Sequence, residues 1–158
     1  MVEGGVSIRL GRAEAWAVLA NAHTGIFTSL RADGVPIALP VWFVALDERI
    51  YLDAVARTKK VARIRRDPRV SFLVESGKRW AELRGVHLTG RAAVLTDLAV
   101  EARARELLRA KYAGWAGDRA AMPEETRAHY ELEHLMIEMV PDERILSFDN
   151  SRIDLARR

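Results

Sequence analysis

The sequence has 158 residues, 49% of them hydrophobic, which is enough for one domain with a substantial core and too little for two ordinary domains. Its 25 lysines and arginines exceed its 22 aspartates and glutamates by a net charge of only +3, so the placement of the basic residues matters more than their number. The absence of cysteine excludes disulfides, thiolate nucleophiles, cysteine-ligated zinc and iron–sulfur clusters.

Neither a membrane span nor a secretory segment is predicted. Uncharged apolar stretches such as Ile37–Leu46 are well short of the roughly 20 residues that a membrane-spanning helix needs. Residues 1–5 include no basic region ahead of an apolar block. We therefore expect a soluble cytoplasmic protein without a membrane partner, folded as a single domain over residues 1–158.

The first predicted element is a helix over Gly11–Ala22, where Trp16, Leu19 and Ala20 recur at helical spacing. The pattern then changes to that of strands. A three-stranded meander is expected, with strands at Ile26–Arg31, Val35–Leu46 and Arg49–Ala54 and turns at Asp33-Gly34 and Asp47-Glu48. Pro36 and Pro40 each remove a ladder donor, so the second strand is expected at a sheet edge or with a bulge.

The later elements alternate between helices and strands. Thr58–Arg66 is expected to form a short helix that Asp67-Pro68 ends. Thr96 or Asp97 can cap a longer helix that reaches Tyr112, and residues 113–126 form a loop or broken helix. The remaining strands are Val70–Glu75, Trp80–Leu95 with bends at Gly85 and Gly90, and His134–Val140 and Arg144–Phe148 around a Pro141-Asp142-Glu143 turn. Consecutive strands without βαβ alternation predict an α+β chain built on an antiparallel barrel.

The segment Arg57–Arg66 has the strongest functional signal, because six of its ten residues are basic. Val61 and Ile64 are spaced to hold one side of the helix against the sheet. A Thr58 cap, free backbone N–H groups and the Lys59 and Lys60 ammonium groups can converge on one anion, which suits a phosphomonoester. By pattern alone, a solvated basic face and a nucleic-acid patch remain as alternatives, although no aromatic residues interleave with these charges.

Four motifs in order resemble the pyridoxamine 5′-phosphate oxidase-like, FMN-binding split-barrel family. They are Thr28–Pro36, Pro40–Phe43, Thr58–Lys60 and Asp67–Val70, and the similarity continues through Gly85, Gly90, Arg91 and Ala92. The resemblance implies a six-stranded antiparallel split barrel with peripheral helices. It also implies a homodimer that holds its cofactor at the subunit interface.

The resemblance also assigns cofactor-binding residues. Thr58, Lys59 and Lys60 resemble the family's phosphate clamp. The strand that lines the isoalloxazine corresponds to Pro40, Val41, Trp42 and Phe43, the strand beneath it includes Thr28 and Ser29, and Arg91 or Thr89 contacts the same cofactor. The Trp42 ring can serve either as a ring platform or as a core residue.

The implied chemistry is hydride transfer to or from an unidentified small organic substrate by an FMN-dependent oxidoreductase. The deazaflavin F420 is the alternative cofactor, because so many cations would suit its oligoglutamate tail. The ring performs the chemistry, so we expect no catalytic side chain and no metal ligand. Pyridoxamine phosphate oxidation itself is not expected, because Ser151-Arg152-Ile153-Asp154 stands where such oxidases carry Arg-x-His.

Non-enzymatic functions form the alternative class: a cofactor- or haem-binding module, or a nucleic-acid-binding module. The four histidines, His23, His87, His129 and His134, form no recognisable ligand motif. We expect a small-molecule substrate. We expect no nucleic-acid partner, because no aromatic residues interleave with the basic residues of Arg57–Arg66.

Overall fold

A computed structural model describes residues 7–153. Asp154, which ends the tail compared above, and residues 1–5 lie outside this range. The described helices are α1 (Arg12–Asn21), α2 (Lys59–Arg66), α3 (Leu98–Lys111) and α4 (Glu124–Tyr130). The described strands are β1 (Gly25–Leu30), β2 (Pro36–Val41), β3 (Val44–Leu46), β4 (Arg49–Val55), β5 (Arg69–Ser76), β6 (Arg84–Val94) and β7 (His134–Asp149).

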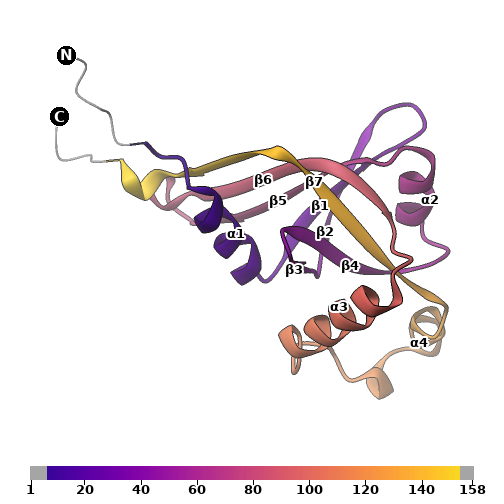
Figure 1. Ribbon diagram of the computed structural model, residues 1–158. Helices are drawn as coiled ribbons and strands as arrows, with labels where there is room; N and C mark the ends of the chain where they lie inside the picture. The colour runs from indigo at the N-terminus through magenta and orange to yellow at the C-terminus, as the bar shows by residue number, and fades with distance from the viewer. Residues whose placement is uncertain (1–6, 154–158) are drawn as a thin grey trace, which may run out of the picture.

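These strands form one antiparallel sheet in the order β2-β1-β5-β6-β7-β4-β3. The α+β class and the curled antiparallel sheet are confirmed, whereas the expected six strands are wrong, because the described sheet has seven. β2 and β3 are the two outermost strands, although only Trp42 and Phe43 separate them in the chain. The sheet therefore curls into a half-barrel, with α3 and α4 together beside one end of it (Figure 1).

The expected single strand Val35–Leu46 is wrong, because it is divided into β2 and β3. β2 pairs with β1 and β3 pairs with β4, so the expected meander does not form. Residues 41–46 are all apolar, so the local pattern continues across the break. Phe43, which lies between the two strands, is 0% exposed and belongs to the main core. The expected edge position of the strand that carries Pro36 and Pro40 is confirmed.

The expected turn at Pro141-Asp142-Glu143 is also wrong. β7 continues through these residues, paired first with β4 and then with β6. Pro141 lies opposite Gly90, at the place where the β6–β7 register shifts, and such irregularities accommodate proline in a sheet. Gly90 is needed at this bulge, because a Cβ atom there would lie 2.3 Å from the carbonyl oxygen of Val140. The expected bend at Gly90 is therefore confirmed.

The two faces of the sheet contact different helices. Alternate residues such as Ile50 and Leu52 point into the main core, to which α1 contributes Leu19 and α2 contributes Val61 and Ile64. On the opposite face, α3 packs through Ala104 against a second cluster formed by Val44, Tyr51 and Met136. The Asp97 carboxylate accepts hydrogen bonds from the N–H groups of Ala99 and Val100, which confirms the predicted cap. Among residues 7–153, no helix is both long and apolar enough to cross a membrane.

Candidate functional site

A cavity of about 930 Å³ lies beside β2, β4 and α3. Its walls come from the end of β2, the first turn of α2, α3, the segment after α3 and the start of β7. Four predicted cofactor-binding residues line it: Pro40, Val41, Trp42 and Lys60. Folding thus brings together two of the motifs that are separated along the chain.

The other predicted residues lie elsewhere. Phe43 and Ser29 are buried, with 0% and 2% of their surface exposed, and Thr28 lies in β1 between Ala38 of β2 and Ser71 of β5. Lys59 and Arg91 are exposed on α2 and β6 and are not part of the lining. Within one subunit, the cavity therefore gathers some of the predicted residues but not all of them.

Lys60 is the cation that α2 directs to this cavity. Burial lowers the pKa of its ammonium group, and the negative charge of Asp53 opposes that effect. Within residues 7–153, the Lys60 ammonium makes no hydrogen bond or ion pair. A partly desolvated and unpaired cation at a cavity wall is arranged to receive an anion.

Thr58 occupies the N-cap position of α2, but the hydrogen bond expected of it is absent: the hydroxyl makes no capping contact. Its Oγ1 atom is buried without a partner, a situation shared by Nε1 of Trp16 among the described residues. A buried hydroxyl left unpaired costs about 1 to 3 kcal/mol. A phosphate at the start of α2 would supply the missing partner, so Thr58 and Lys60 fit a phosphate-bearing cofactor.

Two aromatic residues, Trp42 and Tyr112, also line the cavity. The Trp42 ring, 41% exposed, stacks on the Tyr112 ring at a centroid distance of 4.4 Å. The Tyr112 hydroxyl accepts a hydrogen bond from the Phe43 N–H (2.9 Å) and donates one to the His23 carbonyl oxygen (2.8 Å). Burial raises the pKa of Tyr112, which keeps this hydroxyl protonated. The sequence marked Tyr112 only as a helix end, so its role here was missed.

A charged cluster forms the cavity floor. The Asp53 carboxylate accepts a hydrogen bond from Arg105 at 2.7 Å and contacts Nδ1 of His134. Arg105 also pairs with Glu101 at 2.8 Å. No local sequence motif predicts this cluster, because its members come from β4, α3 and the start of β7. They meet only when the chain folds.

The cavity lining has an excess of positive charge. Lys60, Arg105, Arg109 and Arg119 line it, against the single carboxylate of Asp53. Together with the flat surface of Trp42, which stacks on the buried Tyr112, this lining can receive a ligand that combines a planar ring with negative charge.

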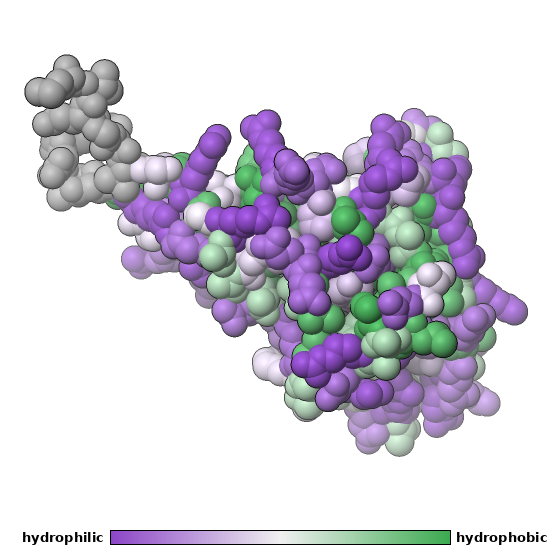
Figure 2. All heavy atoms as spheres, viewed as in Figure 1, coloured by the Kyte–Doolittle hydropathy of each residue, from purple (hydrophilic) through white to green (hydrophobic). Residues whose placement is uncertain are grey.

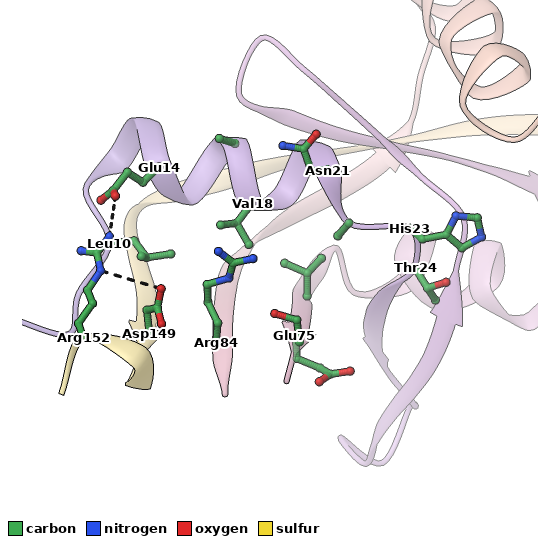
Figure 3. Close-up of a pocket in the computed structure, with 14 residues that line it drawn as sticks. Leu10, Glu14, Val18, Asn21, His23, Thr24, Glu75, Arg84, Asp149 and Arg152 are labelled. Atoms are coloured by element: carbon green, nitrogen blue, oxygen red, sulfur yellow. Dashed lines mark hydrogen bonds and ion pairs between the residues drawn. The ribbon is translucent and has the colours of Figure 1, made fainter. Parts of the chain in front are cut away.

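Another cavity, of about 590 Å³, lies between α1 and the ends of β5, β6 and β7. Figure 3 shows Arg152 within reach of both Glu14 and Asp149, at 2.6 and 4.0 Å, and Arg84 rising toward α1. None of the predicted site residues lines this cavity, and the charge of Arg152 is already compensated. We therefore take the larger cavity as the candidate site.

Comparison with known proteins adds a family and a fold. The sequence model of the family described as pyridoxamine 5′-phosphate oxidase matches residues 12–141. A search among curated proteins found no match. A conserved hypothetical protein from Mycobacterium tuberculosis has a similar solved structure, with a TM-score of 0.76 and 25% identity over 95% of this chain and 92% of that one.

More distant solved structures share the fold. A FAD-binding protein from Mesorhizobium loti has a TM-score of 0.66 and 20% identity over 87% of this chain and 91% of that one. An F420 reductase has a TM-score of 0.60 and 18% identity, covering 82% and 94% of the two chains. The haem storage protein HutZ from Vibrio cholerae has a TM-score of 0.66 and 12% identity, covering 87% and 94%. Proteins with this fold therefore differ in what they bind.

Proposed function

Because the chain belongs to the pyridoxamine 5′-phosphate oxidase family, we propose that it is a cytoplasmic oxidoreductase that binds FMN and transfers a hydride to or from a small organic substrate. F420 is the alternative cofactor. The observation that carries the proposal is the partly buried, unpaired Lys60 in a cavity that Trp42 also lines. The bound ring supplies the hydride chemistry, and the protein binds and orients it.

Each part of the site has a role in this proposal. The Lys60 ammonium, the Thr58 hydroxyl and the free backbone N–H groups of the first turn of α2 bind the phosphate. Pro40, Val41 and Trp42 line the space beside the ring, and Tyr112 holds Trp42 in place by stacking. Asp53 keeps Arg105 and His134 in position at the floor.

The choice between FMN and F420 rests on charge. One phosphate needs few cations, and FMN is satisfied by the start of α2 alone. The further arginines of the lining would suit a cofactor with more than one anionic group, which favours F420 as the alternative. Solved structures with this fold include both a FAD-binding protein and an F420 reductase, which supports either choice.

A homodimer that covers the cavity is the companion proposal. Leu39, Val140 and Leu146 are large apolar side chains exposed on β2 and β7. Figure 2 shows apolar side chains among charged ones over the region where β7 passes α3. Burying such side chains is a favourable contribution to association. Light scattering on the purified protein should give twice the chain mass, and a cofactor-bound monomer would contradict the dimer.

The proposed function is tested by cofactor binding. The purified protein is examined by absorbance spectroscopy, and any small molecule released on denaturation is identified by mass spectrometry. Protein freed of ligand is then titrated with FMN, with F420 and with haemin. We expect binding of FMN or F420 at micromolar concentrations, and binding of neither would refute the proposal. Salt-sensitive nucleic-acid binding that is lost in Lys59→Ala and Lys60→Ala would favour the nucleic-acid alternative.

A further inference from the structure

Two arginines in the cavity lining carry charges that the protein does not neutralise. Within residues 7–153, Arg109 and Arg119 make no hydrogen bond or ion pair through their guanidinium groups. Arg105 differs from them, because Asp53 and Glu101 both bind it. Since Lys60 belongs to the phosphate site proposed above, Arg109 and Arg119 remain as cations without an assigned partner when the cofactor is FMN.

The local structure explains why both arginines reach this cavity. Arg105, Leu108, Arg109 and Tyr112 follow one another at i, i+3, i+4 and i+7, so they share one face of α3. Arg119 begins a separate short helix, which the Asp118 carboxylate starts by accepting the Ala120 N–H at 2.9 Å. Two different elements thus direct their cations to one space, which is not the general basic face of a single helix.

The same lining contains flat and apolar surfaces. It includes the exposed ring of Trp42, which stacks at 4° on the buried ring of Tyr112, together with Met122 and Tyr130. Planar rings pack well on such surfaces, and a guanidinium group binds a carboxylate through two parallel hydrogen bonds. The lining contains one carboxylate, Asp53, and it is already bound to Arg105 and His134, so it does not compete for Arg109 or Arg119.

We propose that this cavity contains a subsite for planar organic acids, with the acid group on Arg109 and Arg119 and the ring against the exposed ring of Trp42. The inference rests on the proposed function in one respect: it reserves Lys60 for the cofactor phosphate, so the acid is the substrate or its product. It narrows the unidentified small organic substrate to an anion that carries an unsaturated ring.

The test compares 2-naphthoate with 2-naphthamide, which has the same ring system and no charge. Both are titrated by calorimetry into the purified protein at low ionic strength. We expect 2-naphthoate to bind about tenfold more tightly, the scale of one charge-assisted hydrogen bond. The variant Arg109→Gln/Arg119→Gln should lose this preference, and added salt should weaken it. Arg103→Gln is the matched control, because Arg103 lies on the same helix but pairs with Glu106 and is not part of the lining.

The outcomes separate this inference from the proposed function. The FMN affinity of the double variant should stay close to that of the unaltered protein, because Lys60 and the start of α2 bind its phosphate, and circular dichroism checks that the variant is folded. Equal binding of the two naphthalene probes, or a preference that survives the double substitution, would overturn the subsite. A preference for 2-naphthoate that is lost in Lys60→Ala and kept in the double variant would also overturn the subsite. If neither cofactor binds but the acid preference is lost in the double variant, the subsite stands and the proposed function fails.

Discussion

The indole ring of Trp42 stacks on the phenol ring of Tyr112, with centroids 4.4 Å apart and planes inclined by 4°. Trp42 lies in the two-residue link between β2 and β3, and Tyr112 follows the last residue of α3. The Lys111 ammonium also donates a hydrogen bond to the Phe43 carbonyl oxygen at 3.0 Å. The end of α3 thus holds the corner at which the chain passes from one edge of the sheet to the other, beside the candidate site.

Tyr112→Phe should lower the free energy of unfolding by about 1 to 3 kcal/mol, because the buried Phe43 N–H loses its acceptor while the aromatic stack remains. Urea denaturation followed by fluorescence measures the change. Tyr130→Phe is the control, because that side chain is 44% exposed and removal of its hydroxyl should change stability little. Equal effects of the two substitutions would show that the hydroxyl contact is unimportant.

Lys60→Ala should weaken binding of a phosphate-bearing cofactor by about 1.5 to 3 kcal/mol, the contribution of a charge-assisted hydrogen bond. Equilibrium titration with FMN or F420 measures it. Arg65→Ala removes the same charge from the exposed surface of α2 and should have a much smaller effect. Unchanged affinity in Lys60→Ala would refute the phosphate assignment.

Burial lowers the pKa of Lys111 to about 8, from 10.5 in the unfolded chain. Between these values the unfolded state binds more protons, so the folded state gains stability as the pH rises through this window. Compared with Lys111→Met, which does not titrate, the unaltered protein should become relatively more stable between about pH 7 and about pH 10. Urea denaturation of both proteins at the two pH values provides the measurement. A stability difference that stays constant or falls would contradict the lowered pKa.

Gly90→Ala should destabilise the fold by about 2 to 3 kcal/mol, because the new Cβ would meet the Val140 carbonyl at the bulge. Gly114→Ala offers a comparison without a clash. Gly114 has a φ of +79° and open space around it, so only backbone strain of about 1 kcal/mol is expected there. Thermal unfolding monitored by circular dichroism ranks the two variants, and the reverse order would contradict the bulge geometry.

Features that depend on neighbouring residues could be predicted from the sequence. The Asp97 cap, the Gly90 bend and the docking of Val61 and Ile64 are confirmed, because capping, backbone freedom and helical spacing act within a few residues. The predicted N-cap position of Thr58 is also confirmed, although its hydroxyl makes no capping hydrogen bond. A cap position follows from local chain direction, whereas the bond depends on which way the side chain is turned by its surroundings.

The two wrong strand predictions have a common cause. Apolar residues continue from β2 into β3, so the local pattern favoured a single strand there. Pro141 lies within β7, so the local pattern favoured two strands there. What decides both cases is which strands become neighbours. β2 and β3 join opposite edges of the sheet, and β7 carries Pro141 past the register shift at Gly90.

The candidate site shows the same division. The sequence by itself determined the family motifs, the basic helix start and the presence of Lys60 in it, because these are properties of contiguous residues. Only the tertiary structure decided that Trp42 would stack on Tyr112, that Asp53 would meet Arg105 and His134, and that Arg109 and Arg119 would share a cavity with Lys60. The physical reason is that these side chains come from elements far apart in the chain, which approach one another only when the curled sheet brings its strands together and α3 packs against its outer face.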